Sequence, residues 1–318
     1  SKARNRGGVD AKTAIRPIRT APRPIGAHGL MPSLPKGCVT RFAPSPTGPL
    51  HLGHAYSACL AHDMARMTQG QFLLRIEDID QSRARPQWEA QIYDDLTWLG
   101  LSWPLPVMRQ SEQMARYRAA LDQLAQQGLI YRCTCRRRDI EAASAAPQEG
   151  APTCGPDGRI YPGTCRGQTV TSAAEAEGAA LRLDLARAFE RLAQMRFTET
   201  GPRHQGRHEI TRDSALAHIG DPVLARPDMG SSYHLSVVVD DAAQGVTHVI
   251  RGEDLFEATA IHVILQNLLA YPVPQYHHHA LIRDEQGKRL AKRDDARAIA
   301  LYRDTGKTPA DIRAMVGL

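Results

Sequence analysis

One segment of the chain reads Arg41-Phe42-Ala43-Pro44-Ser45-Pro46-Thr47-Gly48-Pro49-Leu50-His51-Leu52-Gly53-His54. It predicts a strand that ends near Phe42, a rigid turn of proline and glycine, and a helix that begins near His54. Gly53 lets a ligand approach the backbone closely, and a helix N-terminus offers amide donors to an anion. His51 and His54 lie three residues apart, so both could reach a nucleotide phosphate or ribose. The segment predicts a nucleotide-binding turn.

Strand and helix patterns alternate on both sides of this turn. Short apolar runs predict strands at residues 38–42, 72–76, 233–239 and 246–250. Apolar residues at helical spacing predict helices near 54–68, 88–99, 114–124 and 261–269. Strands that alternate with helices indicate an α/β fold with a parallel sheet covered on both faces. His277-His278-His279 is predicted to be a structural or surface run, because neighbouring strand residues point to opposite faces.

Composition excludes several classes of protein. The chain has 318 residues, of which 42% are hydrophobic, so wholesale disorder is excluded. The sequence contains neither an apolar run long enough for a membrane span nor the pattern of a signal peptide. We therefore expect a cytoplasmic protein whose cysteines are thiols or metal ligands. The net charge of +6 permits a polyanionic partner.

Residues 1–36 differ from the rest, being basic and interrupted by prolines. This composition predicts a flexible tail, either a phosphate-binding arm or a solvated extension.

A second atypical segment begins at residue 133, where cysteines cluster on a predicted insertion. Two of them are one residue apart and two follow later, which indicates a structural zinc site. The four available thiolates are Cys133, Cys135, Cys154 and Cys165. Cys38 and Cys59 lie in predicted elements and are expected to be core residues.

The segment at residues 41–54 resembles the first signature of the class I aminoacyl-tRNA synthetases, in the form of the glutamate-activating branch. Further matches follow in the family's order at residues 75–80, 237–241, 249–254 and 289–293. The resemblance covers roughly residues 38–300. The last match resembles the family's mobile lysine loop, with Arg289 and Ala291 in place of the usual lysine and serine. Basic residues in such a loop suit the charge that develops on a triphosphate.

The resemblance implies a ligase that joins glutamate to ATP as glutamyl-adenylate, with Mg²⁺ expected beside the ATP. Two carboxylates need cations and an ammonium group needs an anion, and arginine can pair with a carboxylate through two hydrogen bonds. The implied glutamate-binding residues are Arg41, Phe42, Ala43, Pro44, Ser45, Glu77, Tyr233 and Arg251. The implied ATP-binding residues are His51, Gly53, His54 and Lys292, and the implied catalytic residues among these are His51, His54 and Lys292.

The resemblance also changes the predicted zinc ligands. In short members of the glutamyl branch, Cys-x-Cys is followed by Tyr-x3-Cys, matched here by Tyr161 and Cys165. It therefore implies Cys133, Cys135, Tyr161 and Cys165 as the ligands of one structural zinc ion. Cys154 stays open as an alternative to Tyr161, because a phenolate is a rarer zinc ligand than a thiolate.

The resemblance implies a Rossmann-like catalytic domain divided by a zinc-binding insertion. The expected boundaries are a flexible tail at 1–36, a first catalytic half at 37–132, an insertion at 133–185, a second catalytic half at 186–275, and the lysine loop with the C-terminal segment at 276–318. Few residues follow Lys292, so we expect no anticodon-binding domain. The chain thus resembles a truncated branch that transfers glutamate to the queuosine base in the anticodon loop of tRNA(Asp). A truncated enzyme that charges a tRNA 3′ end and a non-catalytic RNA-binding relative are the alternatives. We expect a monomer.

Overall fold

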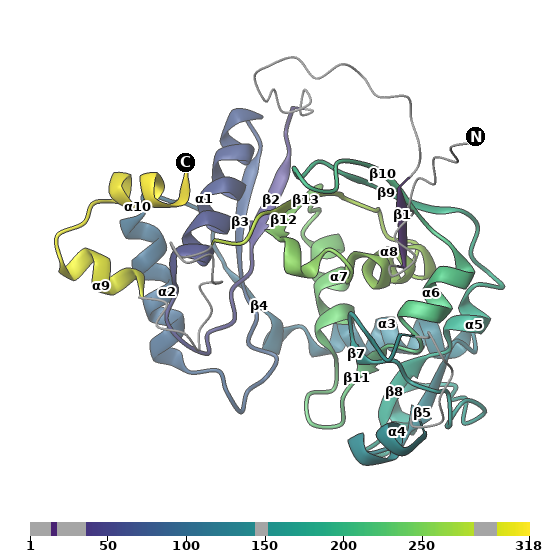
Figure 1. Ribbon diagram of the computed structural model, residues 1–318. Helices are drawn as coiled ribbons and strands as arrows, with labels where there is room; N and C mark the ends of the chain where they lie inside the picture. Colours follow the sequence, from purple (N-terminus) through teal and green to yellow (C-terminus); the bar gives the residue numbers. More distant parts are fainter. Residues whose placement is uncertain (1–13, 18–35, 144–151, 283–297) are drawn as a thin grey trace, which may run out of the picture.

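The computed structural model describes residues 14–17, 36–143, 152–282 and 298–318 (Figure 1). Across these residues, none of the helices combines the length and the apolar character needed to cross a membrane. The lysine loop expected around Lys292 lies outside the described residues.

A parallel sheet forms the centre of the fold. β3 pairs with β2 and β4, while β13 pairs with β12 and β9, all in parallel. The two groups lie side by side, because the Thr247 amide donates to the Val39 carbonyl at 2.9 Å and brings β2 next to β12. The strands are β2 (Val39–Phe42), β3 (Gln71–Ile76), β4 (Met108–Arg109), β9 (Met195–Glu199), β12 (His248–Gly252) and β13 (Gln275–His279). The parallel sheet predicted from the sequence is confirmed.

Helices cover both faces of this sheet. In β3, Phe72 and Leu74 pack into one apolar cluster, whereas Leu73 packs into another, as the alternation of a strand requires. The first cluster includes residues of α1 (Leu52–Met67), α2 (Pro86–Trp98), α9 (Ile299–Asp304) and α10 (Pro309–Val316). The second includes residues of α3 (Met114–Gln126), α5 (Leu185–Ala188), α6 (Arg212–His218), α7 (Tyr233–Ala243) and α8 (Thr259–Leu268).

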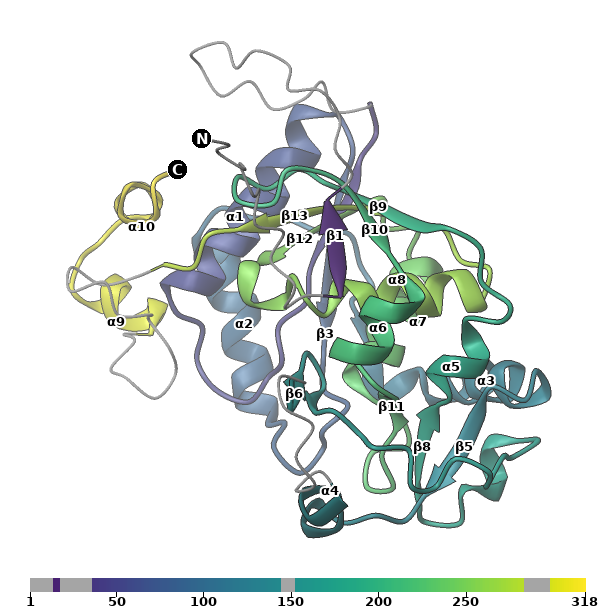
Figure 2. The same cartoon turned by 45° about the vertical axis from the view of Figure 1, so that its right-hand side comes forward.

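A separate antiparallel sheet lies at the opposite end of the molecule from α9 and α10 (Figure 1 and Figure 2). Its order is β11-β8-β5, and a small hairpin of β6 and β7 lies nearby in the chain. The elements are β5 (Ile130–Cys133), α4 (Arg137–Ala143), β6 (Cys154–Gly155), β7 (Gly158–Arg159), β8 (Ala180–Leu183) and β11 (Val223–Ala225). The sheet extends beyond the boundary expected at residue 185, because β11 pairs with β8 through Ala225 and Leu181.

Part of the expected flexible tail is ordered in the structure. β1 (Ile15–Pro17) pairs antiparallel with β10 (Gly206–Ile210), which in turn pairs with β9. The side chains of Ala14 and Ile15 are buried in the apolar cluster beneath this edge. The basic and proline-rich composition of residues 1–36 concealed one short apolar segment that completes a sheet edge.

One predicted strand is wrong. Residues 233–239 were expected to be a strand, but they form the first part of α7. Ser232 begins this helix by accepting a hydrogen bond from the Leu235 amide. Val237, Val238 and Val239 are all buried, so the apolar run has no exposed face and its period does not distinguish a buried helix from a strand.

Candidate active site

A cavity of about 270 Å³ opens at the carboxyl ends of the parallel strands, where ligands bind in open α/β sheets. Among the residues predicted from the sequence, those that line it are Arg41, Phe42, Ala43, His51, Gly53, His54, Glu77, Tyr233 and Arg251. Pro44 and Ser45 do not line it. Lining residues that the sequence did not indicate include Ser57, Asp254 and His279.

His51 and His54 form the N-terminus of α1. The His51 ring caps the helix, since its Nδ1 accepts a hydrogen bond from the Gly53 amide at 3.1 Å. His54 Nδ1 accepts from the His51 amide at 3.1 Å in return, which completes a capping box. Both neutral rings therefore carry their proton on Nε2. A Cβ on Gly53 would lie 3.1 Å from the His51 ring, so this glycine makes room for the cap.

Arg41 is held by a buried carboxylate on α7. Its Nε and Nη2 donate to Asp241 at 3.0 and 3.2 Å, and Arg75 Nη1 donates to the same carboxylate at 2.7 Å. Burial raises the pKa of Asp241, but the two guanidinium groups outweigh it and hold that pKa below its usual value. Within the described residues these bonds leave three N–H groups of Arg41 without a partner. Arg41 can thus still bind a carboxylate through two hydrogen bonds.

Glu77 supplies negative charge to the same cavity. Only 10% of its side chain is exposed, and Arg75 Nη2 donates to its Oε1 at 3.1 Å. Burial raises its pKa, while the nearby Arg75 and Arg41 oppose that shift. The carboxylate retains acceptor capacity for an ammonium group.

Arg251 has a different environment from Arg41. No carboxylate of the described residues lies within ion-pair distance of it, although only 6% of its surface is exposed. Its Nε donates to His278 Nε2 at 3.0 Å and its Nη1 to His262 Nδ1 at 3.0 Å. Its Nη2 donates to Thr259 Oγ1 at 2.9 Å and to the Leu255 carbonyl at 3.3 Å. One of its five N–H groups then has no partner among these residues.

Both arginines were expected to bind carboxylates through two hydrogen bonds. In this arrangement the remaining N–H groups of Arg41 are enough for two such bonds, whereas Arg251 has one N–H group left. Tyr233 stands beside Arg251 in the cavity lining, and its hydroxyl has no hydrogen-bond partner in the described part of the chain. Burial raises the pKa of Tyr233, so the hydroxyl stays a donor. Arg251 and Tyr233 together offer two donors to one ligand group.

The three consecutive histidines of β13 are buried, and their rings form hydrogen bonds at the edge of this site. His278 bonds Arg251, His279 Nε2 lies 2.5 Å from Ser57 Oγ, and His277 Nδ1 lies 3.0 Å from Thr200 Oγ1. The structural interpretation of the run is confirmed and the surface alternative is wrong.

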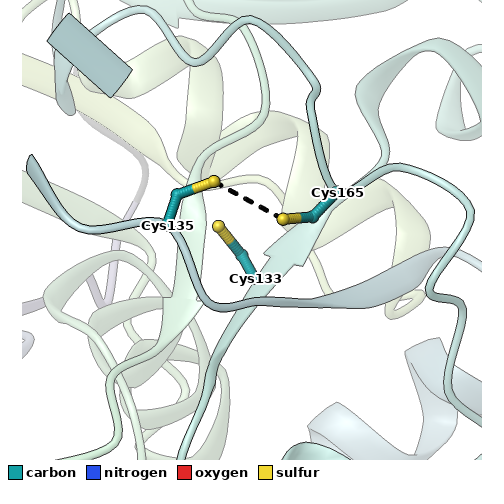
Figure 3. A group of neighbouring side chains, drawn as sticks. All are labelled: Cys133, Cys135 and Cys165. Atoms are coloured by element: carbon teal, nitrogen blue, oxygen red, sulfur yellow. Dashed lines mark hydrogen bonds between the residues drawn. The ribbon is translucent and has the colours of Figure 1, made fainter. Parts of the chain in front are cut away.

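Outside the lining of the cavity, three of the predicted metal ligands converge. The sulfur atoms of Cys133, Cys135 and Cys165 lie within 4.8 Å of one another (Figure 3). The Tyr161 hydroxyl lies 3.4 Å from Cys135 Sγ and accepts a hydrogen bond from the Cys165 amide at 2.9 Å. Cys154 is exposed on β6 and does not belong to this cluster. Cys38 and Cys59 are buried core residues, as expected.

The cluster favours one thiolate. Burial raises the pKa of Cys165, but hydrogen bonds from Tyr161 and the Thr134 backbone lower it to about 7. Burial raises the pKa of Cys135 to about 11 in the same cluster. A thiolate that forms near neutral pH is a prepared ligand for a soft metal ion.

Comparisons with known proteins identify the family of this chain. Residues 37–318 match the family model described as tRNA synthetases class I (E and Q), catalytic domain. A glutamyl-Q tRNA(Asp) synthetase of Rhodobacter capsulatus is 64% identical over 283 residues, covering 88% of this chain and 100% of that protein. Another, of Nocardia farcinica, is 42% identical over 285 residues, covering 88% of this chain and 84% of that protein.

Solved structures show the same fold. A glutamate tRNA ligase from Elizabethkingia meningosepticum in complex with its amino acid superposes with a TM-score of 0.68 at 25% identity, covering 88% of this chain. This chain spans 60% of the length of that structure. A methionyl-tRNA synthetase of Mycobacterium tuberculosis bound to methionyl-adenylate has a TM-score of 0.55 at 11% identity, a likeness of fold alone. The chain therefore belongs to the class I tRNA synthetases of the E and Q group, over the residues of their catalytic domain.

Proposed function

We propose that this protein activates L-glutamate with ATP and transfers it to the queuosine base in the anticodon loop of tRNA(Asp). The observation that carries the proposal is the cavity in which Arg41, Arg251 and Glu77 meet. Two cations and one anion match the two carboxylates and the ammonium group of glutamate. The acceptor is proposed from the relatives that this chain resembles, which are named glutamyl-Q tRNA(Asp) synthetases and match it over most of their length.

The contacts suggest a role for each group. Arg41 binds one carboxylate through two hydrogen bonds, because Asp241 holds its other edge. Arg251 and the Tyr233 hydroxyl bind the second carboxylate together, and Glu77 binds the ammonium group. Phe42 and Ala43, which follow Arg41 in the sequence, form part of the cavity wall.

The ATP-binding residues are proposed from the helix start and the resemblance. His51 and His54 carry their protons on Nε2 and can donate to phosphate oxygens beside Gly53, at the positive end of α1. Lys292, with Mg²⁺, would neutralise the charge that develops as pyrophosphate leaves. Both reactants are charged and reactive, so positioning and charge neutralisation can supply most of the catalysis.

We also propose that Cys133, Cys135, Cys165 and Tyr161 bind one structural zinc ion in an insertion of the catalytic domain. Zinc–sulfur bonds of about 2.3 Å place tetrahedral sulfur ligands roughly 3.8 Å apart. The Cys135 and Cys165 sulfurs lie 3.5 Å apart, which fits that geometry (Figure 3). The Tyr161 hydroxyl, and not the Cys154 thiol, stands beside them. When bound, zinc would stabilise the insertion by joining the segment at Cys133 and Cys135 to the segment at Tyr161 and Cys165.

The decisive experiment labels tRNA(Asp) with radioactive glutamate in the presence of ATP, using tRNA prepared with and without queuosine. We expect labelling that needs ATP, glutamate and queuosine together. A glutamate ester on the 3′ end would protect the terminal ribose from periodate, and this result would favour the truncated tRNA-charging enzyme. Absence of glutamate-dependent pyrophosphate exchange would favour a non-catalytic RNA-binding relative.

A further inference from the structure

Arg251 stands at the centre of a buried hydrogen-bonded chain that extends into the insertion. On one side its Nη1 contacts His262 Nδ1 at 3.0 Å, and His262 Nε2 lies 3.1 Å from His234 Nδ1. His234 Nε2 then lies 3.3 Å from Oδ1 of Asp157, a residue between β6 and β7. On the other side Arg251 Nε contacts His278. Two imidazoles therefore separate Arg251 from the hairpin of the insertion.

The direction of every bond in this chain follows from Arg251. A guanidinium has donors and no acceptor, so His262 Nδ1 must be unprotonated. His262 is neutral, because burial and the nearby Arg251 hold its pKa well below the usual value. Its proton is then on Nε2 and is donated to His234 Nδ1. His234 in turn carries its proton on Nε2, which faces the Asp157 carboxylate.

His278 repeats the same logic on the opposite side. Its Nδ1 lies 2.5 Å from Glu199 Oε2 and its Nε2 accepts from Arg251. Burial lowers the pKa of His278 to about 4 despite the Glu199 carboxylate, so this ring is neutral as well. Arg251 is thus held between two neutral imidazoles, each oriented by a carboxylate farther away.

Neutral acceptors orient a cation without cancelling its charge. Asp241 forms a direct ion pair with Arg41, whereas Arg251 has no such pair among the residues that the structure describes, and its neutral neighbours leave its charge available to a ligand. A buried cation without a counter-ion is costly, and small displacements of a binding group reduce catalysis strongly. The site therefore needs a rigid support for Arg251 that carries no charge next to it.

We propose that His262, His234 and Asp157 are positioning residues that hold Arg251 for the substrate carboxylate, and that they connect the β6–β7 hairpin to substrate binding. This inference rests on the proposed function of Arg251. Asp157 also accepts the Val223 amide at 2.9 Å through Oδ2, so the hairpin, β11 and α7 meet at one carboxylate. Loss of Asp157 lets the His234 proton move to Nδ1, where it opposes the His262 proton and releases Arg251.

The test compares glutamate and ATP binding in His262→Leu, His262→Gln and Asp157→Ala. Leucine removes both ring contacts, whereas glutamine keeps one acceptor and one donor. We expect His262→Leu to raise the KM and Kd for glutamate about tenfold and to leave the KM for ATP within about twofold. Glutamine should restore glutamate binding to within about threefold of the wild type. Asp157→Ala should weaken glutamate binding about fivefold.

A matched control separates positioning from general support of the insertion. Asp122 accepts a hydrogen bond from the Ala173 amide at 2.7 Å. In the described structure it makes no hydrogen bond to Arg251, His262, His234 or Asp157, so Asp122→Ala removes the same kind of bond without changing the support of Arg251. We expect its glutamate binding to be unchanged. Equal glutamate binding in the wild type, His262→Leu and Asp157→Ala would overturn the proposal.

A second measurement does not need glutamate. Nitrogen NMR of histidine-labelled protein reports the tautomer of each ring, and His262→Gln assigns the His262 signals. We expect Nε2–H tautomers for His262 and His234, with an Nδ1–H form of His234 appearing in Asp157→Ala. These tautomers in a protein that does not bind glutamate would refute the proposed function while supporting the hydrogen-bonded chain from Arg251 to Asp157. An Nδ1–H tautomer of His262 in the wild type would overturn that chain of hydrogen bonds.

Discussion

Arg75 Nη1 lies 2.7 Å from Asp241 Oδ1, and neither side chain has more than 7% of its surface exposed. Asp241 also binds Arg41, and Arg75 also binds Glu77. One buried guanidinium from β3 therefore joins Asp241, the anion that anchors Arg41, to Glu77, the cavity anion proposed for the ammonium group. The candidate site is assembled on this pair.

Arg75→Met should lower the free energy of unfolding by about 3–5 kcal/mol, because it leaves buried carboxylates without their shared cation. Urea denaturation measures the loss. The matched control is Arg109→Met, since Arg109 is 39% exposed where it pairs with Glu89. Arg109→Met should lower the free energy of unfolding by about 1 kcal/mol or less, as for other surface ion pairs. Equal losses in the two variants would show that the Arg75 network is not a buried ion cluster.

The sequence predicted the residues that line the cavity better than the residues that bind and orient those side chains. Arg41, Glu77 and the two histidines of α1 belong to local motifs, and the parallel sheet brings those motifs to one edge. Arg75 belongs to the matched segment at residues 75–80, which predicts no role for it, although a charge inside the apolar run of β3 indicates a buried partner. Its partner Asp241 lies 166 residues away in the sequence, and no local pattern in a single sequence indicates which distant residue pairs with Arg75.

The support of Arg251 was missed for a similar reason. His234, His262 and Asp157 come from α7, α8 and the insertion, and no spacing in the sequence connects them. The prediction of a strand over residues 233–239 concealed the relation further, because it placed His234 on a strand. The run Val237–Val239 favours a strand by propensity, and tertiary packing against α3 and α8 overrides that preference.

The cysteine cluster predicts about one zinc ion per chain, measured by metal analysis of the purified protein. Cys165→Ser should lose zinc and lower the melting temperature, because a closed structural site contributes directly to folding. Cys154→Ser should keep full zinc content, since that thiol is exposed and outside the cluster. Tyr161→Phe should weaken zinc binding and so identifies the fourth ligand. Full zinc content in Cys165→Ser would refute the site.

Asp95 predicts a pH dependence of stability. This residue of α2 is buried, and neither carboxylate oxygen has a hydrogen-bond partner within the described ranges of the chain. Burial raises its pKa from 3.8 to about 6, an increase that Asp94 enlarges and Arg303 opposes. Between these values the folded state keeps a proton that the unfolded chain releases, so stability falls as the pH rises through this window. Asp95→Asn should raise the free energy of unfolding by up to about 3 kcal/mol at pH 8.

The same substitution should have little effect at pH 4, where the side chain of the folded wild type is already neutral. Urea unfolding at both pH values measures the difference. Asp228→Asn is the control, because Asp228 is 62% exposed, pairs with Arg226 on the surface and is not among the groups that shift the pKa of Asp95. A gain from Asp95→Asn that is the same at both pH values would indicate a cause other than the Asp95 charge.

The proposed acceptor leads to a prediction about the tRNA. If the queuosine base itself enters the cavity beside Arg41 and Glu77, the anticodon arm alone has to contact the protein. Lysine and arginine contacts with its phosphates should then supply affinity that falls with salt, while an unstacked loop base reaches the pocket. An isolated anticodon stem-loop with queuosine should be glutamylated nearly as well as whole tRNA(Asp), and a stem-loop with guanine at that position should accept nothing. Labelling of both RNAs under identical salt measures this. Glutamate on the 3′ end of whole tRNA with an inert stem-loop would replace base modification with tRNA charging, because the acceptor end and the anticodon cannot occupy one cavity.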